Sequence, residues 1–171
     1  MVLTPAKPRS TPGYTAGAAV LFGAAAVILT ALAFQYFGGY APCPLCLQQR
    51  YAYYVAIPLL FVALVLIGAD RPGTAAVLFA IVAIAFLANA GLGIYQAGAE
   101  WKLWPGPDTC AGAQGIATDA GSLLQDLSRT QVIRCDEAAW RFLGLSFAGW
   151  NAVASFALFL GALRAAVRAA R

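Results

Sequence analysis

Four cysteines are the residues of this chain with the clearest potential for redox chemistry. Two form the closely spaced motif Cys43-Pro-Leu-Cys46, and the other two, Cys110 and Cys135, lie in the only long polar segment. A disulfide across two intervening residues closes almost no loop and therefore contributes little stability. Such a motif usually contains a reactive thiol. Two cysteine pairs of this kind indicate a protein that passes electrons between dithiols.

The closely spaced motif is expected where an apolar helix begins. Cys46 lies at or just before the first turn of the second apolar stretch. The partial positive charge and the free N–H groups of a helix N-terminus favour a thiolate and lower the pKa of such a cysteine. Arg50 follows four residues later and therefore lies on the same helix face. Its guanidinium could stabilise the Cys46 thiolate or donate a hydrogen bond to a carbonyl oxygen of a bound electron acceptor. The alternative is an interfacial arginine that only reaches toward water.

The cysteines could instead have a structural role, either as a disulfide or as ligands of a metal ion. Cys110 and Cys135 could form a structural disulfide, which would close a loop of about 26 residues and contribute roughly 3.5 kcal/mol. Four thiolates could bind zinc, but structural zinc sites usually use two closely spaced pairs, and the second pair here is 25 positions apart. The chain has no histidine, which removes His-ligated haem and any His-assisted nucleophile. No metal site is expected, and the structural disulfide stays open as an alternative for the loop pair.

Long stretches without charge must provide the elements that position these residues. The chain is 61% hydrophobic and only 11% charged, which is too apolar for an ordinary soluble domain. A bilayer core of about 30 Å needs about 20 helical residues. Four uncharged stretches meet that length and predict spans at residues 14–36, 51–69, 74–96 and 143–164. The sequence therefore predicts an all-α membrane protein, a bundle of four transmembrane helices in one domain (residues 14–168) after a cytoplasmic tail (residues 1–13).

The charges around the spans predict their orientation. A short first loop (residues 37–50) and a long second loop (residues 97–142) would carry all four cysteines on one side of the membrane. On the other side a single acid accompanies six basic residues, which are Lys7, Arg9, Arg71, Arg164, Arg168 and Arg171. The positive-inside rule then places both termini in the cytoplasm. The net charge of +4 is thus an orientation signal, and no basic patch with interleaved aromatic residues indicates nucleic-acid binding.

Secondary features concern the long loop and the polar residues of the spans. Leucines recur at helical spacing in residues 120–130, which predicts a short amphipathic helix. That helix could lie on the outer leaflet or fold onto the top of the bundle. Asn89, Gln96 and Asn151 lie in or at the ends of spans, and interhelical hydrogen bonding is their expected role.

Taken together, the motifs resemble those of the DsbB family of disulfide-bond-forming membrane proteins. Three segments carry the likeness, namely Cys43-Pro-Leu-Cys46 followed by Arg50, Trp104-Pro-Gly-Pro-Asp-Thr-Cys110, and Cys135-Asp-Glu-Ala-Ala-Trp140. The first is similar to the quinone-side motif of that family, and the others are similar to its second external loop and the start of its last helix. The resemblance covers nearly the whole chain. One departure is Gln48-Gln49 before Arg50, where members often carry a tyrosine or an acid.

The resemblance implies a quinone-dependent thiol oxidase of the bacterial inner membrane. A periplasmic DsbA-like oxidase with a thioredoxin-like fold would attack Cys110, and the Cys135 that is released would attack Cys43. Cys46 would then face the quinone, of ubiquinone or menaquinone type, with Arg50 beside it. The steps before the quinone would all be thiol–disulfide exchange. Two alternatives are kept: a close variant that serves a dedicated client, and a non-catalytic small membrane protein whose loop disulfide is inert.

Overall fold

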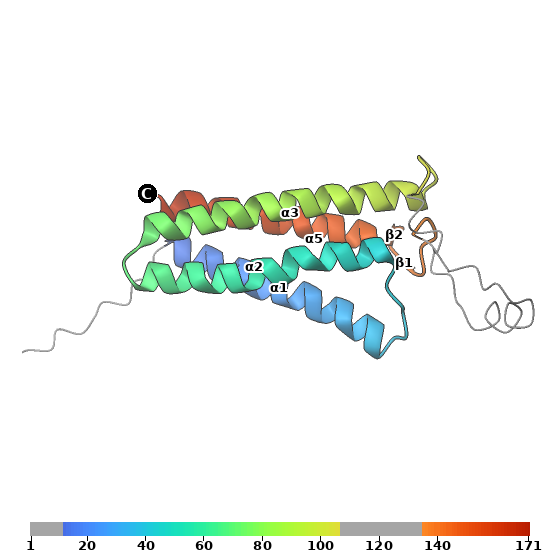
Figure 1. Cartoon of the computed structure of the whole chain (residues 1–171), viewed down its shortest axis with the longest axis horizontal. Coiled ribbons are helices and arrows are strands. Elements are labelled where there is room, and N and C mark those ends of the chain that lie inside the picture. The colour runs from blue at the N-terminus through green and yellow to red at the C-terminus, as the bar shows by residue number, and fades with distance from the viewer. Residues whose placement is uncertain (1–11, 107–134) are drawn as a thin grey trace, which may run out of the picture.

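Four long helices account for most of the structure. The computed structural model describes residues 12–106 and 135–171. The helices are α1 (Pro12–Tyr36), α2 (Pro44–Gly68), α3 (Pro72–Glu100) and α5 (Phe147–Ala169), and they run side by side along the long axis of the molecule (Figure 1). By length and composition, each of them can cross a membrane. The predicted all-α bundle of four membrane-spanning helices is confirmed.

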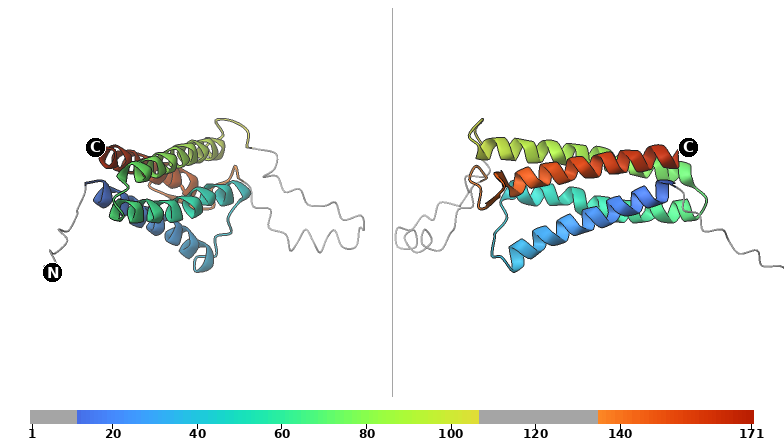
Figure 2. Two further views of the ribbon diagram at one scale, coloured as in Figure 1. Left: turned by 60° about the vertical axis from the view of Figure 1, so that its left-hand side comes forward. Right: turned by 180° about the vertical axis from the view of Figure 1, so that it is seen from behind.

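The bundle has two distinct ends because successive helices run antiparallel. α1 begins beside the end of α5, since a Cβ placed on Gly13 would lie 3.2 Å from the Cβ of Ala169. The turn between α2 and α3 lies at that same end (Figures 1 and 2). The opposite end, which we call the cysteine end, is formed by residues 37–46, 96–106 and 135–147. Toward the cysteine end α1 diverges from the other helices (Figure 1).

Both the core of the bundle and its outer surface are apolar. Phe79 and Phe86 of α3 and Leu60 of α2 are fully buried, and α3 packs most extensively on α5. Large apolar side chains are exposed on the outward faces of the helices, among them Phe22, Phe61, Ile84 and Leu160. A continuous apolar surface is unfavourable in water, whereas in hydrocarbon it matches the surrounding chains. The pattern fits helices that contact lipid.

Small residues let α3 and α5 approach closely, as packing in lipid requires. A Cβ on Gly93 of α3 would lie 3.0 Å from the backbone nitrogen of Ala152 and 3.1 Å from the carbonyl oxygen of Ala148, both in α5. Gly91, two residues earlier, has open space where its Cβ would be. Alanine at position 93 therefore tests the close contact between the two helices, whereas alanine at position 91 tests helix propensity alone.

We expect Gly93→Ala to destabilise the bundle by about 1–3 kcal/mol, because backbone atoms of α5 must move to admit the methyl group. Gly91→Ala should be neutral or slightly stabilising, since alanine favours a helix over glycine by up to about 1 kcal/mol. Thermal unfolding of both variants in the same detergent measures the two effects. Equal unfolding temperatures for the two variants would contradict the close contact between α3 and α5.

The second helix begins earlier than the predicted span of residues 51–69. α2 starts at Pro44, and Cys43 caps it by accepting a hydrogen bond at its Sγ from the backbone N–H of Cys46, at 3.1 Å. Proline suits the first turn of a helix because its missing N–H would have no partner there. Hydropathy marks the part of a helix that lies in lipid and does not register such caps. Residues 44–50 of the predicted loop are therefore helical, and Cys46 lies within the first helical turn, where the sequence placed it.

The last helix begins later than the predicted start at residue 143. A small antiparallel hairpin precedes α5, formed by β1 (Arg141–Phe142) and β2 (Leu145–Ser146). Its turn residues Leu143 and Gly144 have φ values of 50° and 83°, as a two-residue type I′ turn requires. Ser146 then caps α5 by accepting a hydrogen bond from the N–H of Gly149 at 3.2 Å. A right-handed helix cannot continue through a turn with positive φ, so the apolar stretch begins before the helix does.

Two further predicted boundaries fall short of the helix ends. α3 continues to Glu100 beyond the predicted end at residue 96, and α5 continues to Ala169 beyond residue 164. Charged or polar residues in these last turns hide the continuing helix from a hydropathy pattern. The amphipathic helix predicted for residues 120–130 lies outside the described residues, as do Cys110 and most of the predicted tail.

Candidate redox site

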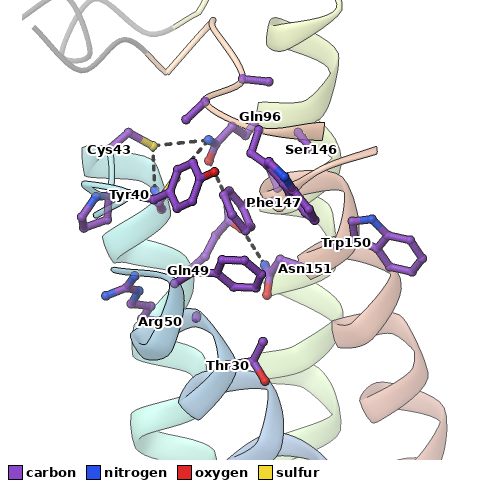
Figure 3. A pocket seen from close by; sticks show the side chains of 18 of the residues that line it. Thr30, Tyr40, Cys43, Gln49, Arg50, Gln96, Ser146, Phe147, Trp150 and Asn151 are labelled. Carbon is purple, nitrogen blue, oxygen red and sulfur yellow. Dashed lines mark hydrogen bonds between the residues drawn. The ribbon is translucent and has the colours of Figure 1, made fainter. Parts of the chain in front are cut away.

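A cavity of about 430 Å³ opens at the cysteine end of the bundle (Figure 3). Its walls come from the diverging end of α1, the first turns of α2, the end of α3 and the start of α5. The lining is mostly apolar, and a few polar side chains interrupt it. They include Cys43, Cys46, Arg50, Gln96, Glu100 and Asn151.

Cys43 and Cys46 are free thiols in one wall of this cavity. Cys43 is buried, and Cys46 is partly buried. The side-chain nitrogen Nε2 of Gln96 donates to both sulfur atoms, at 3.3 Å each. Hydrogen bonding to Cys46, together with burial, raises the pKa of the Cys43 thiol. Cys43 is therefore the member of the pair that keeps its proton, and Cys46 is the member that is left to ionise.

Cys135 of the second cysteine pair lies against the first pair. It is disulfide-bonded and fully buried, and it packs in one small apolar cluster with Cys43 and Leu45, with Cys46 at the edge of that cluster. Of the four predicted site cysteines, three are thus brought together. Cys110 lies outside the described residues.

Arg50 lies one helical turn beyond Cys46 on α2 and lines the same cavity. Its guanidinium nitrogen Nη1 donates a hydrogen bond to the side-chain oxygen of Gln35 on α1. The positive charge is thus held at the cavity wall by a neutral amide. The sequence predicts a cation beside the Cys46 thiolate, and the structure puts this cation between α1 and α2, where it is bonded to Gln35 one helical turn from Cys46.

A chain of neutral polar side chains leads from the thiols into the bundle, and the cysteine pattern did not predict it. Gln49 donates to Gln96 at 2.7 Å, Asn151 donates to Gln49 at 2.6 Å, and Tyr53 donates to Asn151 at 2.7 Å. Asn151 and Gln96 thus make the expected interhelical bonds, and Asn89 makes another to Ser155 at 2.9 Å. The sequence did not predict that Gln96 contacts both sulfur atoms. The sequence did offer one signal for this contact: Gln96 is a polar residue at the end of a predicted span, on the same side of the membrane as the Cys43–Cys46 motif.

Four aromatic rings form part of the cavity lining. Phe147 stacks on Trp140 with ring centroids 5.0 Å apart, and it meets Phe34 of α1 edge-on at 5.1 Å. Tyr40 contacts Phe147 at 5.6 Å. All four residues line the cavity. Planar rings of this kind offer offset stacking to a flat aromatic or quinonoid molecule, so the site combines a dithiol, an arginine and a stacking surface.

Comparison with known families decides which kind of redox protein this is. The family model described as "Disulfide bond formation protein DsbB" matches residues 14–165. The chain belongs to the DsbB family. It is accordingly a disulfide bond formation protein of the membrane, and membership of the DsbB family implies thiol oxidase activity.

Individual relatives agree with the family assignment. The chain is 35% identical over 128 residues to disulfide bond formation protein B of Aromatoleum aromaticum, a match that covers 70% of this chain and 71% of the relative. It is 30% identical over 137 residues to the protein of the same name from Marinobacter nauticus, covering 75% and 77% of the two chains. No solved structure matches the chain.

Proposed function

We propose that the chain reoxidises a periplasmic DsbA-like dithiol protein of thioredoxin-like fold and passes the electrons to a quinone of the bacterial inner membrane. The observation that carries this proposal is the placement of Cys43 and Cys46 between two different neighbours. On one side they contact Cys135 of the second pair, and on the other they line an apolar, aromatic cavity. A dithiol in that position can receive electrons from one side and deliver them to the other.

The thiol steps take the order that the family resemblance implies, and the packing of Cys135 against Cys43 supports one of them. A reduced partner attacks the loop disulfide through Cys110 and forms a mixed disulfide, which frees Cys135. When the Cys43–Cys46 pair is in its disulfide form, the Cys135 thiolate then attacks Cys43, against which it packs, which breaks the Cys43–Cys46 bond and leaves Cys46 as the thiolate. The partner's second thiolate displaces Cys110, which attacks Cys135, re-forms the loop disulfide and returns Cys43 as a thiol. Each step exchanges one thiolate for another through a mixed disulfide, so no oxidant is needed until electrons leave the Cys43–Cys46 pair.

The residues of the cavity fit a quinone. Trp140 and Phe147 would stack on its ring, the apolar remainder of the lining suits its body, and Arg50 would donate to one carbonyl oxygen. A bound quinone supplies the acceptor that takes up two electrons and two protons. The acceptor would enter from the lipid, in which it is dissolved, beside the end of α1 that diverges from the other helices (Figure 1). The chain itself would orient the acceptor beside Cys46 and exclude water with its aromatic wall.

The proposed function also requires a particular orientation of the chain in the membrane. Both termini would lie in the cytoplasm and the cysteine end would face the periplasm, because the basic residues cluster at the far end of the spans. That orientation gives the loop cysteines access to an oxidising compartment, in which disulfides form and persist.

Reduction of a quinone by the purified protein tests the proposed function. Protein in detergent, a reduced thioredoxin-fold dithiol partner and a soluble ubiquinone analogue should together form quinol, followed by the loss of quinone absorbance. A protein without its partner gives the background rate. A quinone that stays oxidised while partner thiols are plentiful would favour the non-catalytic alternative, a small membrane protein with an inert loop disulfide.

Arg50→Ala should raise the KM for quinone by about tenfold, because a hydrogen bond from a charged donor contributes about 1.5 kcal/mol or more. Arg50→Lys should be intermediate, since lysine keeps the charge and loses the planar fork. The same quinone assay with varied quinone concentration measures the effect, and thermal unfolding controls for the loss of the bond to Gln35. Gln35→Leu removes that bond and keeps the arginine. An unchanged KM in Arg50→Ala would discard the role of Arg50 in quinone binding.

A further inference from the structure

Glu100, the last residue of α3, is a buried acid in the wall of the redox cavity. Its exposed fraction is 8%, and it lines the cavity together with both free thiols. Its Oε1 accepts a hydrogen bond from Gln96 Nε2 at 3.4 Å. Its Oε2 has no hydrogen-bond partner among the residues that the structure describes. A buried carboxylate in that position is unfavourable unless it is paired, so the second oxygen requires an explanation.

Gln96 connects Glu100 to the redox pair. The same nitrogen, Nε2, donates to Cys43 Sγ, to Cys46 Sγ and to Glu100 Oε1. One amide group therefore holds an ionisable carboxyl group and both reacting sulfurs in a single cluster. Three acceptors compete for the two hydrogens of that nitrogen, and a protonated carboxyl group would relieve the competition because it also donates.

Among the described residues no cation forms an ion pair with the Glu100 carboxylate, although the charge of Arg141 acts on it and the Ser146 side chain hydrogen-bonds to it. Arg141 of β1 donates from Nη2 to the backbone carbonyl oxygen of Glu100 at 3.2 Å. Arg50 of α2 is bonded to Gln35, and Lys102 pairs with Asp136 at 2.7 Å. Glu137, the other acid of the cavity lining, is exposed. Within the described ranges 12–106 and 135–171, Glu100 is the one buried acid, and the nearby cations have other hydrogen-bond partners.

We propose that Glu100 is the proton-exchanging residue of the redox cavity, an inference that deepens the function proposed above and depends on it. Formation of the Cys43–Cys46 disulfide breaks the S–H bond of Cys43, forms the S–S bond and releases two electrons to the acceptor. Protonated Glu100 gives its proton to an oxygen of the reduced acceptor and takes up the proton that Cys43 loses. The second proton for the acceptor comes from solvent and replaces the one that Cys46 lost on ionising. Two electrons and two protons thus pass from dithiol to quinone, and Glu100 ends as it began.

The decisive variant is Glu100→Gln, which keeps the size of the side chain and an oxygen that can accept from Gln96 but cannot exchange a proton. We expect the kcat of quinol formation to fall by about 10²-fold, as for loss of a general acid, with little change in the KM for quinone. Glu100→Asp, which keeps the acid, should recover part of the rate. The matched control is Asp70→Asn, which removes an acid from the turn between α2 and α3 at the opposite end of the bundle and should leave the rate unchanged.

A readout independent of turnover comes from infrared spectroscopy of the quinone-free protein in its dithiol state. The wild type should show the C=O stretch of a protonated carboxylic acid near neutral pH, and Glu100→Gln should lack it while Asp70→Asn keeps it. Absence of that band from the wild type would overturn the proposal, because an ionised Glu100 has no proton to give. Should Glu100→Gln fail to fold, the infrared band of the wild type and the rate of Glu100→Asp still decide the matter.

The failure of this inference is distinguishable from failure of the proposed function. If the wild type forms quinol and Glu100→Gln forms it at the same kcat, Glu100 loses its role and the thiol oxidase stands. If the wild type itself forms no quinol with a reduced partner, the proposed function fails, and the role of Glu100 fails with it.

Discussion

Replacing Cys46 with alanine should reduce quinol formation by more than roughly 10³-fold, as loss of a nucleophile that forms the covalent bond of the reaction does. Cys46 and Cys43 are the free thiols of the cavity, and no other described sulfur lines it. Cys43 alone cannot replace the pair, because a disulfide between positions 43 and 46 cannot form without the second sulfur atom. The measurement is the rate of quinone reduction with a saturating concentration of reduced partner.

A folded Cys46→Ala protein is the condition for interpreting that result. The cap of α2 uses the backbone N–H of Cys46 and the Sγ of Cys43, and alanine at position 46 keeps both atoms. The thermal unfolding temperature should therefore change little. Leu47→Ala, one residue along the same turn on an exposed position, is the matched control and should keep its activity. Quinol formation by Cys46→Ala at the wild-type rate would contradict the role of Cys46 as the thiolate that passes electrons to the quinone.

Predictability from the sequence differed between the helices and their ends. Long uncharged stretches are a strong signal for lipid-crossing segments, so the four helices could be predicted. The ends depend on single backbone groups: the Cys43 cap starts α2 at Pro44, and the turn at Leu143 and Gly144 delays α5. Strands of two residues carry no detectable alternation. The hairpin before α5 could therefore not be predicted from the periodicity of the sequence.

In the redox site too, some features could be predicted from the sequence and others could not. The reactive pair and Arg50 could be proposed because their spacing along one helix fixes their relative position. The contact of Cys135 with Cys43 joins residues far apart in the sequence, and only the fold determines it. Gln96 was assigned to helix packing, since a polar residue in a span usually has that role. Its bonds to both sulfurs depend on where the end of α3 lies relative to the start of α2.

Replacing Cys135 with serine should make a mixed disulfide between the chain and its dithiol partner accumulate through Cys110. In the wild type the freed Cys135 reacts onward, either with Cys43 or back with Cys110, and serine can do neither. Serine is close to cysteine in size, which suits a fully buried position. Cys110 is a free thiol in this variant, so the partner is added in its disulfide form; the Cys110 thiolate attacks the partner's disulfide and releases the partner's second thiolate. Non-reducing electrophoresis, followed by mass spectrometry of the linked peptides, measures the product and identifies the client.

The trapping experiment distinguishes a redox-active loop disulfide from a structural one, because its result depends on which of the two loop cysteines remains in the variant. Cys110→Ser should trap no partner, although it removes the same loop disulfide, and the double variant should behave like Cys110→Ser. A mixed disulfide that forms through Cys43 or Cys46 in the Cys135→Ser protein would reverse the order of the relay. If neither single variant captures a thioredoxin-fold protein, the disulfide of Cys135 is structural. The packing of Cys135 against Cys43 would then be a feature of the fold with no part in electron transfer.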